Sequence, residues 1–487
     1  MLLSFQVFVA CAVAGTPPPT PSPWAAMAAD DLKAIHEAVS TSHPGPVDPL
    51  NTGFREWLDQ GLNEGLAAAA RARTFGDYAA AVRRYVAGFR DGHLFLKFRV
   101  THVEPRWMGF IISFRGGRYE LAQVDAADSS LPPAGSELLD CDGVPPATLL
   151  VRDVFPYFGN PALEASRVAV TPFLLVDVGL PRSTVKACRA SRSGRVTTFE
   201  LHERGVDPQD LARRQNAGAF GPAPQMGVRP FGLKGVWVTL PSFDNSHAKA
   251  LRSVVSQSPS WRHKEVVVFD LRGNTGGNSL WGERIAEGLW GKAHARARVA
   301  PTRRATFVDW RVSDANLKYL EAARANFASK LGPLAPDTQW AATNAERVRR
   351  GLAAHESLVR EPPELVPAEL SKEASSSYSG RVFFVTDGRC FSACLDFADV
   401  LLAFPKVVHV GQTTDADTLY MEVRTQELPS GISRLGLPMK VYRGRSRGHN
   451  VPLIPSHRYE GDISDTGSLE TWLSTVLEKR SPTPSAR

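Results

Sequence analysis

The sequence predicts an α/β protein built from several domains. Helical periodicity fills roughly the first hundred residues, and strand-like alternation follows to about residue 205. From residue 233 onward, apolar β-branched runs alternate with helical segments, which is typical of a sheet covered by helices. At 487 residues the chain is also too long for one hydrophobic core.

Residues 15–104 are predicted to form a helical N-terminal domain. The segments DLKAIHEAVSTSH, FREWLDQGLNEGLAAAARAR and FGDYAAAVRRYVAGF each carry apolar residues at three- and four-residue spacing. The third segment runs into Asp91-Gly92-His93, after which LFLKFRV alternates like a strand. His93 is therefore expected on a tight turn between a helix and a strand.

A strand-rich module is predicted for residues 105–205, because MGFIISF, RYELAQV and VTTFELHE are separated by Gly- and Pro-containing turns. Residues 206–229 are rich in Gly, Ala and Pro and are predicted to be a linker. The α/β domain follows at 230–482. Its runs GVWVTL, EVVVFDL, RVFFVTD and VVHVGQT suit a parallel sheet buried on both faces. A mostly helical insertion at about 292–378 is predicted to be a cap or lid.

Charge and cysteine usage exclude several classes of protein. The formal charge is +7, but the arginines are scattered rather than gathered into one basic block, which argues against nucleic-acid binding. The tightest group, Arg443, Arg445 and Arg447, is expected to lie on one strand face, either solvated or facing an anionic ligand. No Cys/His set has zinc-ligand spacing, so we infer no metal and no cofactor.

The first residues are typical of an export signal. The apolar run Leu2–Val13 leads into Ala12-Val13-Ala14, so residues 1–14 are predicted to be a signal peptide of a periplasmic or secreted protein. Cys11 leaves a lipid-anchored start as an alternative. Nothing later is apolar for long enough to span a membrane. The remaining cysteines are either the disulfides Cys141–Cys188 and Cys390–Cys394 or four small buried side chains.

Two turns stand out as candidates for chemistry. Phe269-Asp-Leu-Arg-Gly-Asn-Thr-Gly-Gly277 is a strand ending in a glycine-rich turn, which can present backbone N–H groups to a developing oxyanion. Thr386-Asp-Gly-Arg-Cys-Phe-Ser392 is a second strand and turn, with a helix opening at the serine. A serine at that place is ordinarily a helix cap. Gly92-His93 supplies the base that a serine nucleophile requires.

The motifs Asp91-Gly92-His93, Asp270–Gly277, Gly388-x-x-x-Ser392-Ala393 and Val410-Gly411 occur in one order along the chain. Together they resemble the C-terminal-processing (tail-specific) serine peptidases and their tricorn-type relatives. The resemblance runs from about 30 to 475. It implies a ClpP/crotonase-like α/β catalytic domain and a peptide or protein substrate.

The resemblance also implies roles for individual residues. Ser392 is expected to be the nucleophile, and backbone N–H groups of Gly276, Gly277 and Ala393 are expected to hold the oxyanion. The tail-specific branch takes the proton with a lysine, but Asp417 stands at that register. The tricorn-type branch uses a histidine from an Asp-Gly-His-like turn, which makes His93 the expected base.

No carboxylate stands where the tricorn-type enzymes have the acid that orients the histidine. Glu422, Glu427 and Glu460 are candidate substitutes, each also explicable as a surface residue. Asp91 is expected to form the turn by accepting backbone hydrogen bonds.

The module 105–205 resembles a degenerate PDZ domain, with Met108-Gly-Phe-Ile-Ile as its carboxylate-binding loop. This resemblance implies capture of an extended peptide or of a peptide C-terminus. A plain β-barrel used only for packing is the alternative. For the whole protein, the alternatives to a peptidase are a catalytically silent peptide-binding protein and an esterase or other acyl hydrolase. The sequence does not indicate an oligomeric state.

Overall fold

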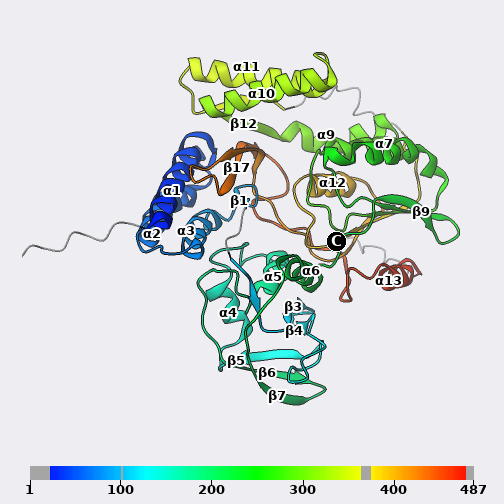
Figure 1. Cartoon of the computed structure of the whole chain (residues 1–487). Coiled ribbons are helices and arrows are strands. Elements are labelled where there is room, and N and C mark those ends of the chain that lie inside the picture. The colour runs from blue at the N-terminus through cyan, green and yellow to red at the C-terminus, as the bar shows by residue number, and fades with distance from the viewer. Residues whose placement is uncertain (1–21, 100–102, 364–374, 479–487) are drawn as a thin grey trace, which may run out of the picture.

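The computed structural model describes residues 22–99, 103–363 and 375–478. The predicted signal peptide, residues 1–14, lies outside the described residues. Figure 1 shows the N-terminal helices at one side of the molecule, a small sheet with its own helices below, and the α/β domain opposite the N-terminal helices. No helix within the described ranges has the length and apolarity needed to cross a bilayer.

The N-terminal helices form an antiparallel bundle, and capping side chains mark where two of the helices begin. The Ser22 side chain caps the first helix by accepting the N–H of Ala25, and Thr74 and Asp77 form a reciprocal capping box at the third. The apolar faces meet around buried side chains such as Leu32 and Tyr78. The helices are α1 (Pro23–Ser42), α2 (Thr52–Ala69) and α3 (Phe75–Ala87).

An antiparallel sheet joins this bundle to distant parts of the chain. Its central strand, β17, pairs along one edge with β16. Along the other edge it pairs first with the strand that follows the Asp-Gly-His turn and then with a strand of the insertion. Leu435, Leu437 and Val441 of β17 lie in the same core as the three helices. The strands are β1 (Phe95–Phe98), β12 (Phe307–Arg311), β13 (Leu358–Glu361), β16 (Tyr420–Glu427) and β17 (Ser433–Arg443).

The prediction of a mostly helical cap at 292–378 is therefore only partly right. Two strands of the segment, β12 and β13, extend the β17 sheet, and its helical hairpin packs on Trp310 and Met439 of that sheet. Apolar strand residues, rather than the longer helices, anchor the insertion in the fold. Its helices are α9 (Lys292–Ala305), α10 (Asp314–Leu331) and α11 (Pro336–Ala353).

The module at 105–205 is a five-stranded antiparallel sheet in the order β3-β4-β5-β6-β7, with two helices. Cys141 and Cys188 lie opposite one another on β5 and β6 and form a disulfide. The elements are β2 (Arg106–Trp107), β3 (Ile111–Arg115), β4 (Arg118–Ala122), β5 (Glu137–Cys141), α4 (Pro146–Asp153), α5 (Glu164–Val170), β6 (Ala187–Arg192), β7 (Arg195–Glu200) and β8 (Arg204–Gly205).

The segment 206–229 is not a linker, contrary to the prediction. It contains helix α6 (Pro208–Ala219), which Asp207 caps by accepting two backbone N–H groups. Leu211 of this helix is buried against Ile111 of the module. Gly and Ala are present because the helix packs closely: a Cβ at Gly218 would lie 2.7 Å from Ile111.

The α/β domain is built on a six-stranded sheet in the order β18-β15-β14-β11-β10-β9. All neighbouring pairs are parallel except β9 with β10. The predicted apolar runs form its central strands, which are buried on both faces. The strands are β9 (Gly227–Phe231), β10 (Gly235–Thr239), β11 (Val266–Asp270), β14 (Arg381–Thr386), β15 (Val407–Gly411) and β18 (His457–Arg458).

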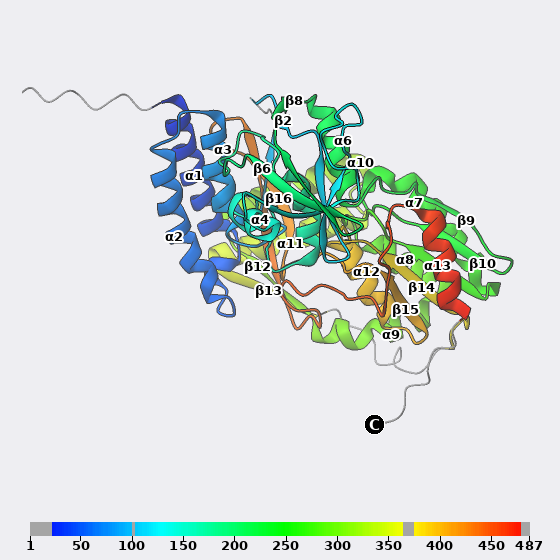
Figure 2. The ribbon, with the colours of Figure 1, turned by 90° about the horizontal axis from the view of Figure 1, so that it is seen from below.

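Helices cover both faces of this sheet. On one face, Phe397 and Leu401 of α12 pack with Phe269 and Phe384 of the strands. On the other face, Leu469 of α13 joins the strand side chains in a second core. In Figure 2, α13 lies beside β10, on the far side of the domain from the N-terminal helices. The helices are α7 (Ala248–Gln257), α8 (Leu280–Trp290), α12 (Ala393–Leu402) and α13 (Thr466–Glu478).

The buried His409 of β15 makes the stability of this domain sensitive to acid. Burial lowers its pKa from 6.5 to about 3, although a hydrogen bond to the Ile454 backbone opposes the shift. Its ring stacks on Phe384 at 4.4 Å between centroids. Between pH 6.5 and 3, His409 is protonated in the unfolded chain but stays neutral in the folded chain. This group therefore lowers the free energy of unfolding by about 1.4 kcal/mol for each pH unit of acidification.

We expect His409→Gln to flatten the dependence of the free energy of unfolding on pH between pH 6.5 and 4.5 by about this slope. Denaturant unfolding at a series of pH values, followed by tryptophan fluorescence, measures it. The exposed His457 of the neighbouring strand provides the control, and His457→Gln should leave the slope unchanged. Equal slopes for wild type and His409→Gln contradict the assignment.

Candidate active site

The two predicted turns meet because their strands are neighbours in the parallel sheet. Strands β11 and β14 pair in register, with Asp270 opposite Val385, so their carboxyl ends lie at one edge. Two backbone hydrogen bonds continue the pairing into the turns. The Leu271 N–H donates to the Val385 carbonyl, and the Phe391 N–H donates to the Asn274 carbonyl. This edge is where open parallel sheets usually place their sites.

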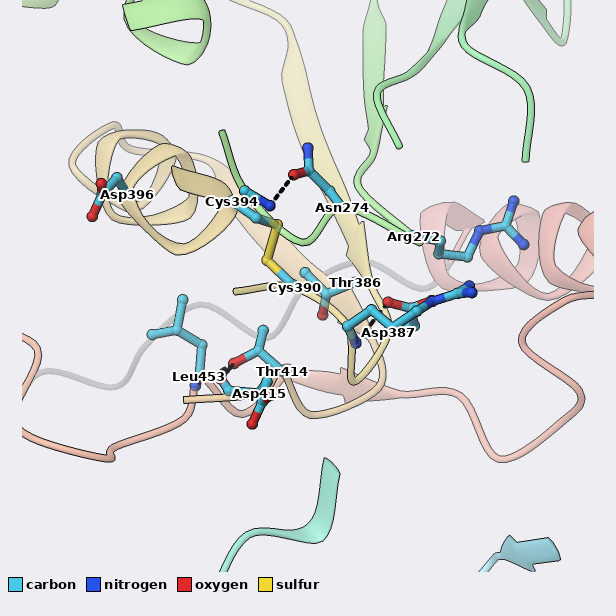
Figure 3. Close-up of a disulfide and its surroundings, with 12 residues drawn as sticks. Arg272, Asn274, Thr386, Asp387, Cys390, Cys394, Asp396, Thr414, Asp415 and Leu453 are labelled. Carbon is cyan, nitrogen blue, oxygen red and sulfur yellow. Dashed lines mark hydrogen bonds and ion pairs between the residues drawn. A yellow bond between two sulfur atoms is a disulfide. The ribbon is translucent and has the colours of Figure 1, made fainter. Parts of the chain in front are cut away.

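Buried polar side chains hold the two turns together. The Asp387 carboxylate accepts the N–H of Gly273 from the other turn at 3.1 Å and also binds the guanidinium of Arg389. Asn274 spans β10 and its own turn by donating to the Leu240 carbonyl at 2.8 Å. Figure 3 shows Arg272 and Asn274 in the first turn and Asp387 in the second. The turns are thus fixed before any substrate arrives.

Ser392 adopts a strained backbone conformation at the start of α12. Its φ is +55° and its ψ is −122°, a region that residues other than glycine rarely occupy. Its side chain caps no N–H of the helix, although it stands at the N-cap. The hydroxyl is therefore not used in the ordinary capping role of a serine at this position, and it is available for chemistry.

Glycine is required beside Ser392 because the other turn approaches closely. A Cβ at Gly276 would lie 2.8 Å from the Ser392 Cβ, and one at Gly277 would lie 2.2 Å from the Phe243 backbone. Both glycines have positive φ. The Gly276 N–H donates to Asn274 Oδ1 at 2.9 Å, so it is already engaged and does not fit the predicted oxyanion role.

The other two predicted oxyanion donors fit better. Gly277 forms a parallel bridge with Phe243 that uses the Gly276 carbonyl and the Asn278 N–H. Its own N–H has no acceptor among the described residues. The same holds for the N–H of Ala393, the first residue of α12, which lies near Gly276. Ala393 follows Ser392 directly, and Gly277 follows Gly276, the glycine that packs against Ser392. The helix start adds a favourable field for an anion.

A disulfide spans the serine. Cys390 in the turn and Cys394 in the first turn of α12 are bonded, and both are fully buried. Figure 3 shows this bond linking the turn to the helix beneath Asn274. It closes a loop of only a few residues around Ser392, so its main effect is on the local backbone rather than on global stability.

His93 lies on the predicted turn after α3 and reaches the α/β domain. Its ring packs against Phe391, the residue before Ser392, with 4.6 Å between ring centroids. His93 is 93% buried, and its Nδ1 has no hydrogen-bond partner within the part of the chain that the structure describes. Within the described residues no hydrogen bond joins His93 to Ser392. In peptidases without substrate this contact is often long.

A buried network fixes the backbone at His93. Asp91 accepts the N–H of His93 at 3.0 Å, the Thr418 hydroxyl at 2.9 Å and Nε2 of His43 at 3.1 Å. The Gly45 N–H donates to His43 Nδ1, so Nε2 carries the proton given to Asp91. Burial lowers the pKa of His43 below 6.5 and keeps it neutral. Burial is the largest single effect on Asp91 and raises its pKa, but the hydrogen bonds and charge interactions with His43 and His93 together lower the pKa below its usual value, so the carboxylate stays ionised.

The predicted orienting acids do not contact His93. Glu422 pairs with Lys440, Glu427 pairs with Arg99 and Arg434, and Glu460 pairs with Arg458. Each carboxylate already has a basic neighbour on a strand or loop. None makes a hydrogen bond to the histidine within the described residues.

Asp417, at the register of the tail-specific lysine, is a fully buried structural acid. Its Oδ1 accepts from Arg445 at 2.6 Å and from Arg447, which also binds Asp399. The arginines expected on a solvated strand face are thus buried ion-pair partners. Arg443 likewise binds Asp48 and Asp309.

Two residues near the site were missed from sequence. No local sequence signal links His43 to Asp91. Asp415 lies near Phe391, and burial raises its pKa to about 7 against the opposing Ala416 N–H. Thr414 holds the adjacent backbone by accepting the Leu453 N–H at 2.9 Å, as Figure 3 shows.

In the described part of the chain no His, Cys, Asp and Glu group has a metal-binding arrangement.

Comparison with known proteins identifies the domain that carries this site. Residues 236–449 match the model of peptidase family S41. This segment, less than half of the chain, is similar to the peptidase domain of that family. The match confirms the C-terminal-processing peptidase family that the motifs predicted, and the protein is a serine-type peptidase.

The fold as a whole resembles that of mature CPAF. The TM-score is 0.60 at 14% sequence identity, and the alignment covers 95% of this chain and 99% of the other. The structure of mature CPAF complexed with lactacystin is similar, with a TM-score of 0.57 at 14% identity and coverage of 94% and 100%. At this identity the likeness concerns the fold. No curated protein sequence matches the chain.

The disulfide across Ser392 should support activity through geometry. We expect replacement of both Cys390 and Cys394 by Ala to lower kcat about tenfold or more, because a small displacement of a reacting group is costly. The matched control replaces Cys141 and Cys188, whose disulfide lies in the distant module. Peptidase kinetics of both double variants measure the effect. Equal kcat in the two would show that the local bond does not position the serine.

Proposed function

We propose that this peptidase cleaves peptide bonds through an acyl-enzyme on Ser392, with His93 as general base. His93 takes the hydroxyl proton as Oγ attacks the substrate carbonyl carbon, and the N–H groups of Gly277 and Ala393 hold the resulting oxyanion. The protonated His93 then gives its proton to the leaving amine. Water attacks the ester in the second half-reaction by the same route and restores the free serine.

The observation that carries this proposal is the conformation of Ser392. A serine with φ of +55° at a helix start, whose hydroxyl caps nothing, costs folding free energy of about 1–3 kcal/mol. Such strain persists where the surrounding structure imposes it. Here it leaves the hydroxyl free of capping, next to the Ala393 N–H, which has no acceptor among the described residues. The unpartnered Nδ1 of the buried His93 is the second support, because buried polar atoms normally find partners.

Asp91 takes the place of a classical orienting acid in this proposal. It binds the backbone rather than the ring of His93, so it positions the residue through the turn. His43 and Thr418 hold Asp91 in return. The arrangement rests on three elements of the fold, namely the ends of α1 and α3 and the start of β16.

We further propose an exported enzyme that works in the periplasm or outside the cell. The disulfides Cys141–Cys188 and Cys390–Cys394 support this, because such bonds persist in oxidising compartments. Alkylation of the native protein before and after reduction tests it, since four newly reactive thiols should appear only after reduction. Free thiols at these positions in the untreated native protein would count against export. Capture of an extended peptide by the PDZ-like module 105–205 is also part of this proposal.

Labelling with a fluorophosphonate probe tests the nucleophile. We expect wild type to be labelled and Ser392→Ala to lose labelling and peptidase activity completely. His93→Gln should lower kcat about 10²- to 10⁴-fold, the usual contribution of a general base. The exposed His202→Gln serves as a control without effect. Labelling retained in Ser392→Ala would refute the assignment, and measurable peptide binding without turnover in wild type would favour a silent binding protein.

The positioning role of Asp91 predicts a kcat effect without a KM effect. We expect Asp91→Asn to lower kcat about 10- to 100-fold with KM nearly unchanged, because the amide keeps the shape but weakens the hold on His43 and the turn. Thr418→Val removes only one of the three hydrogen bonds and should have a smaller effect. Steady-state kinetics on one peptide substrate separate these outcomes. A rise in KM alone for Asp91→Asn would contradict the role.

A further inference from the structure

A cavity of about 250 Å³ adjoins the proposed active site. It lies where the end of α3, the segment 157–166 of the strand-rich module and the α/β domain meet. Phe391 forms part of its wall, and the same ring packs on His93. Gly92 and Asp91 also line it. A substrate residue close to the scissile bond is therefore within reach of the cavity.

Arg83 of α3 lines this cavity without an anionic partner. Its guanidinium carbon lies 4.3 Å from the centroid of the Phe98 ring and 4.9 Å from that of Phe158. No carboxylate pairs with it among the described residues, whereas the adjacent Arg84 binds Glu64. Burial lowers the pKa of Arg83 from 12.5 to about 10, so it remains charged at neutral pH.

A half-buried guanidinium that contacts only aromatic faces among the described residues lacks acceptors for its hydrogen-bond donors. Cation–π contacts return part of the lost hydration, but they leave the in-plane N–H donors of the guanidinium unused. Those donors match a carboxylate, which a guanidinium binds with two parallel hydrogen bonds. The two stacked rings fix the plane of the Arg83 group in advance, and this lowers the entropy cost of binding.

The remaining charged groups of the cavity are compatible with an anion. Arg90 stands at its exposed margin, also without an ion pair among the described residues. The Asp91 carboxylate is occupied by its three hydrogen bonds. Asp415 has a pKa of about 7, because burial disfavours its charge, so it is only half ionised at neutral pH. Two arginines thus outweigh the acids in this cavity.

We propose that this cavity binds a carboxylate of the peptide substrate through Arg83, and that the peptidase therefore prefers substrates with such a group near the scissile bond. The inference rests on the proposed function, because it assumes that Ser392 is the nucleophile. A peptide offers the carboxylate from two sources, an acidic side chain or the chain's own C-terminus.

The test uses matched fluorogenic peptides with the full-length enzyme. One series exchanges Glu for Gln at each position near the cleaved bond in C-terminally amidated peptides. A second series compares a free with an amidated C-terminus in peptides without acidic residues. We expect kcat/KM to favour the carboxylate-bearing member of one series about 10- to 100-fold. The series that shows the preference identifies the source of the carboxylate.

Arg83→Gln should reduce this preference ratio nearly to one, and Arg83→Lys should retain part of it because the charge remains without the planar fork. Arg84→Gln, one residue along on the exposed face of α3, should keep the full ratio. Thermal unfolding of each variant verifies that it is folded. Because the readout is a ratio between two peptides, a general loss of activity does not imitate the result.

Fluorophosphonate labelling of Ser392 tells a failure of the carboxylate site from a failure of the proposed nucleophile. Wild type that is labelled and cleaves peptides but shows no preference in either series overturns the carboxylate site alone. A preference that survives in Arg83→Gln overturns it as well. Absence of Ser392 labelling in wild type overturns the proposed function and this inference with it.

Discussion

The parallel pairing of β11 with β14 is the constraint on which the candidate site depends. It places two turns, separated by more than one hundred residues in sequence, at the same edge of the sheet. One turn supplies the glycines and the other supplies Ser392. The close approach of Gly276 to Ser392 leaves no space for a Cβ, so the site requires this pairing and this residue type together.

The strain at Ser392 is supported by groups that surround it rather than by the serine itself. Asp387 and Asn274 tie the turns to one another and to β10. The Cys390–Cys394 disulfide ties the turn to the helix. Buried and complete hydrogen bonds of this kind are strong in a low-dielectric interior, and together they offset the cost of one unfavourable backbone conformation.

The base comes from a different part of the chain, so the site also depends on how the N-terminal helices sit on the α/β domain. Strand β1, which follows His93, pairs with β17, and Tyr420 of β16 packs among the helices. Asp417 stands at the position where the tail-specific enzymes have their catalytic lysine, and here that position has a structural role. An aspartate there, bound by Arg445 and Arg447, becomes part of the packing between the domains rather than of the chemistry.

Local sequence determined the secondary elements, the two glycine turns, the Asp-Gly-His turn and the family, because capping, periodicity and turn chemistry act over a few residues. It did not determine that 206–229 is helical or that the insertion carries sheet strands, since burial by distant partners decided both. Nor did the sequence predict three contacts at the site: the hydrogen bond of His43 to Asp91, the hydrogen bond made by the Gly276 N–H, and the ion pairs of Asp417. The sequence thus predicted the turn that carries Ser392. Only the tertiary structure decided which groups surround that serine, because each of them arrives from a different element of the fold.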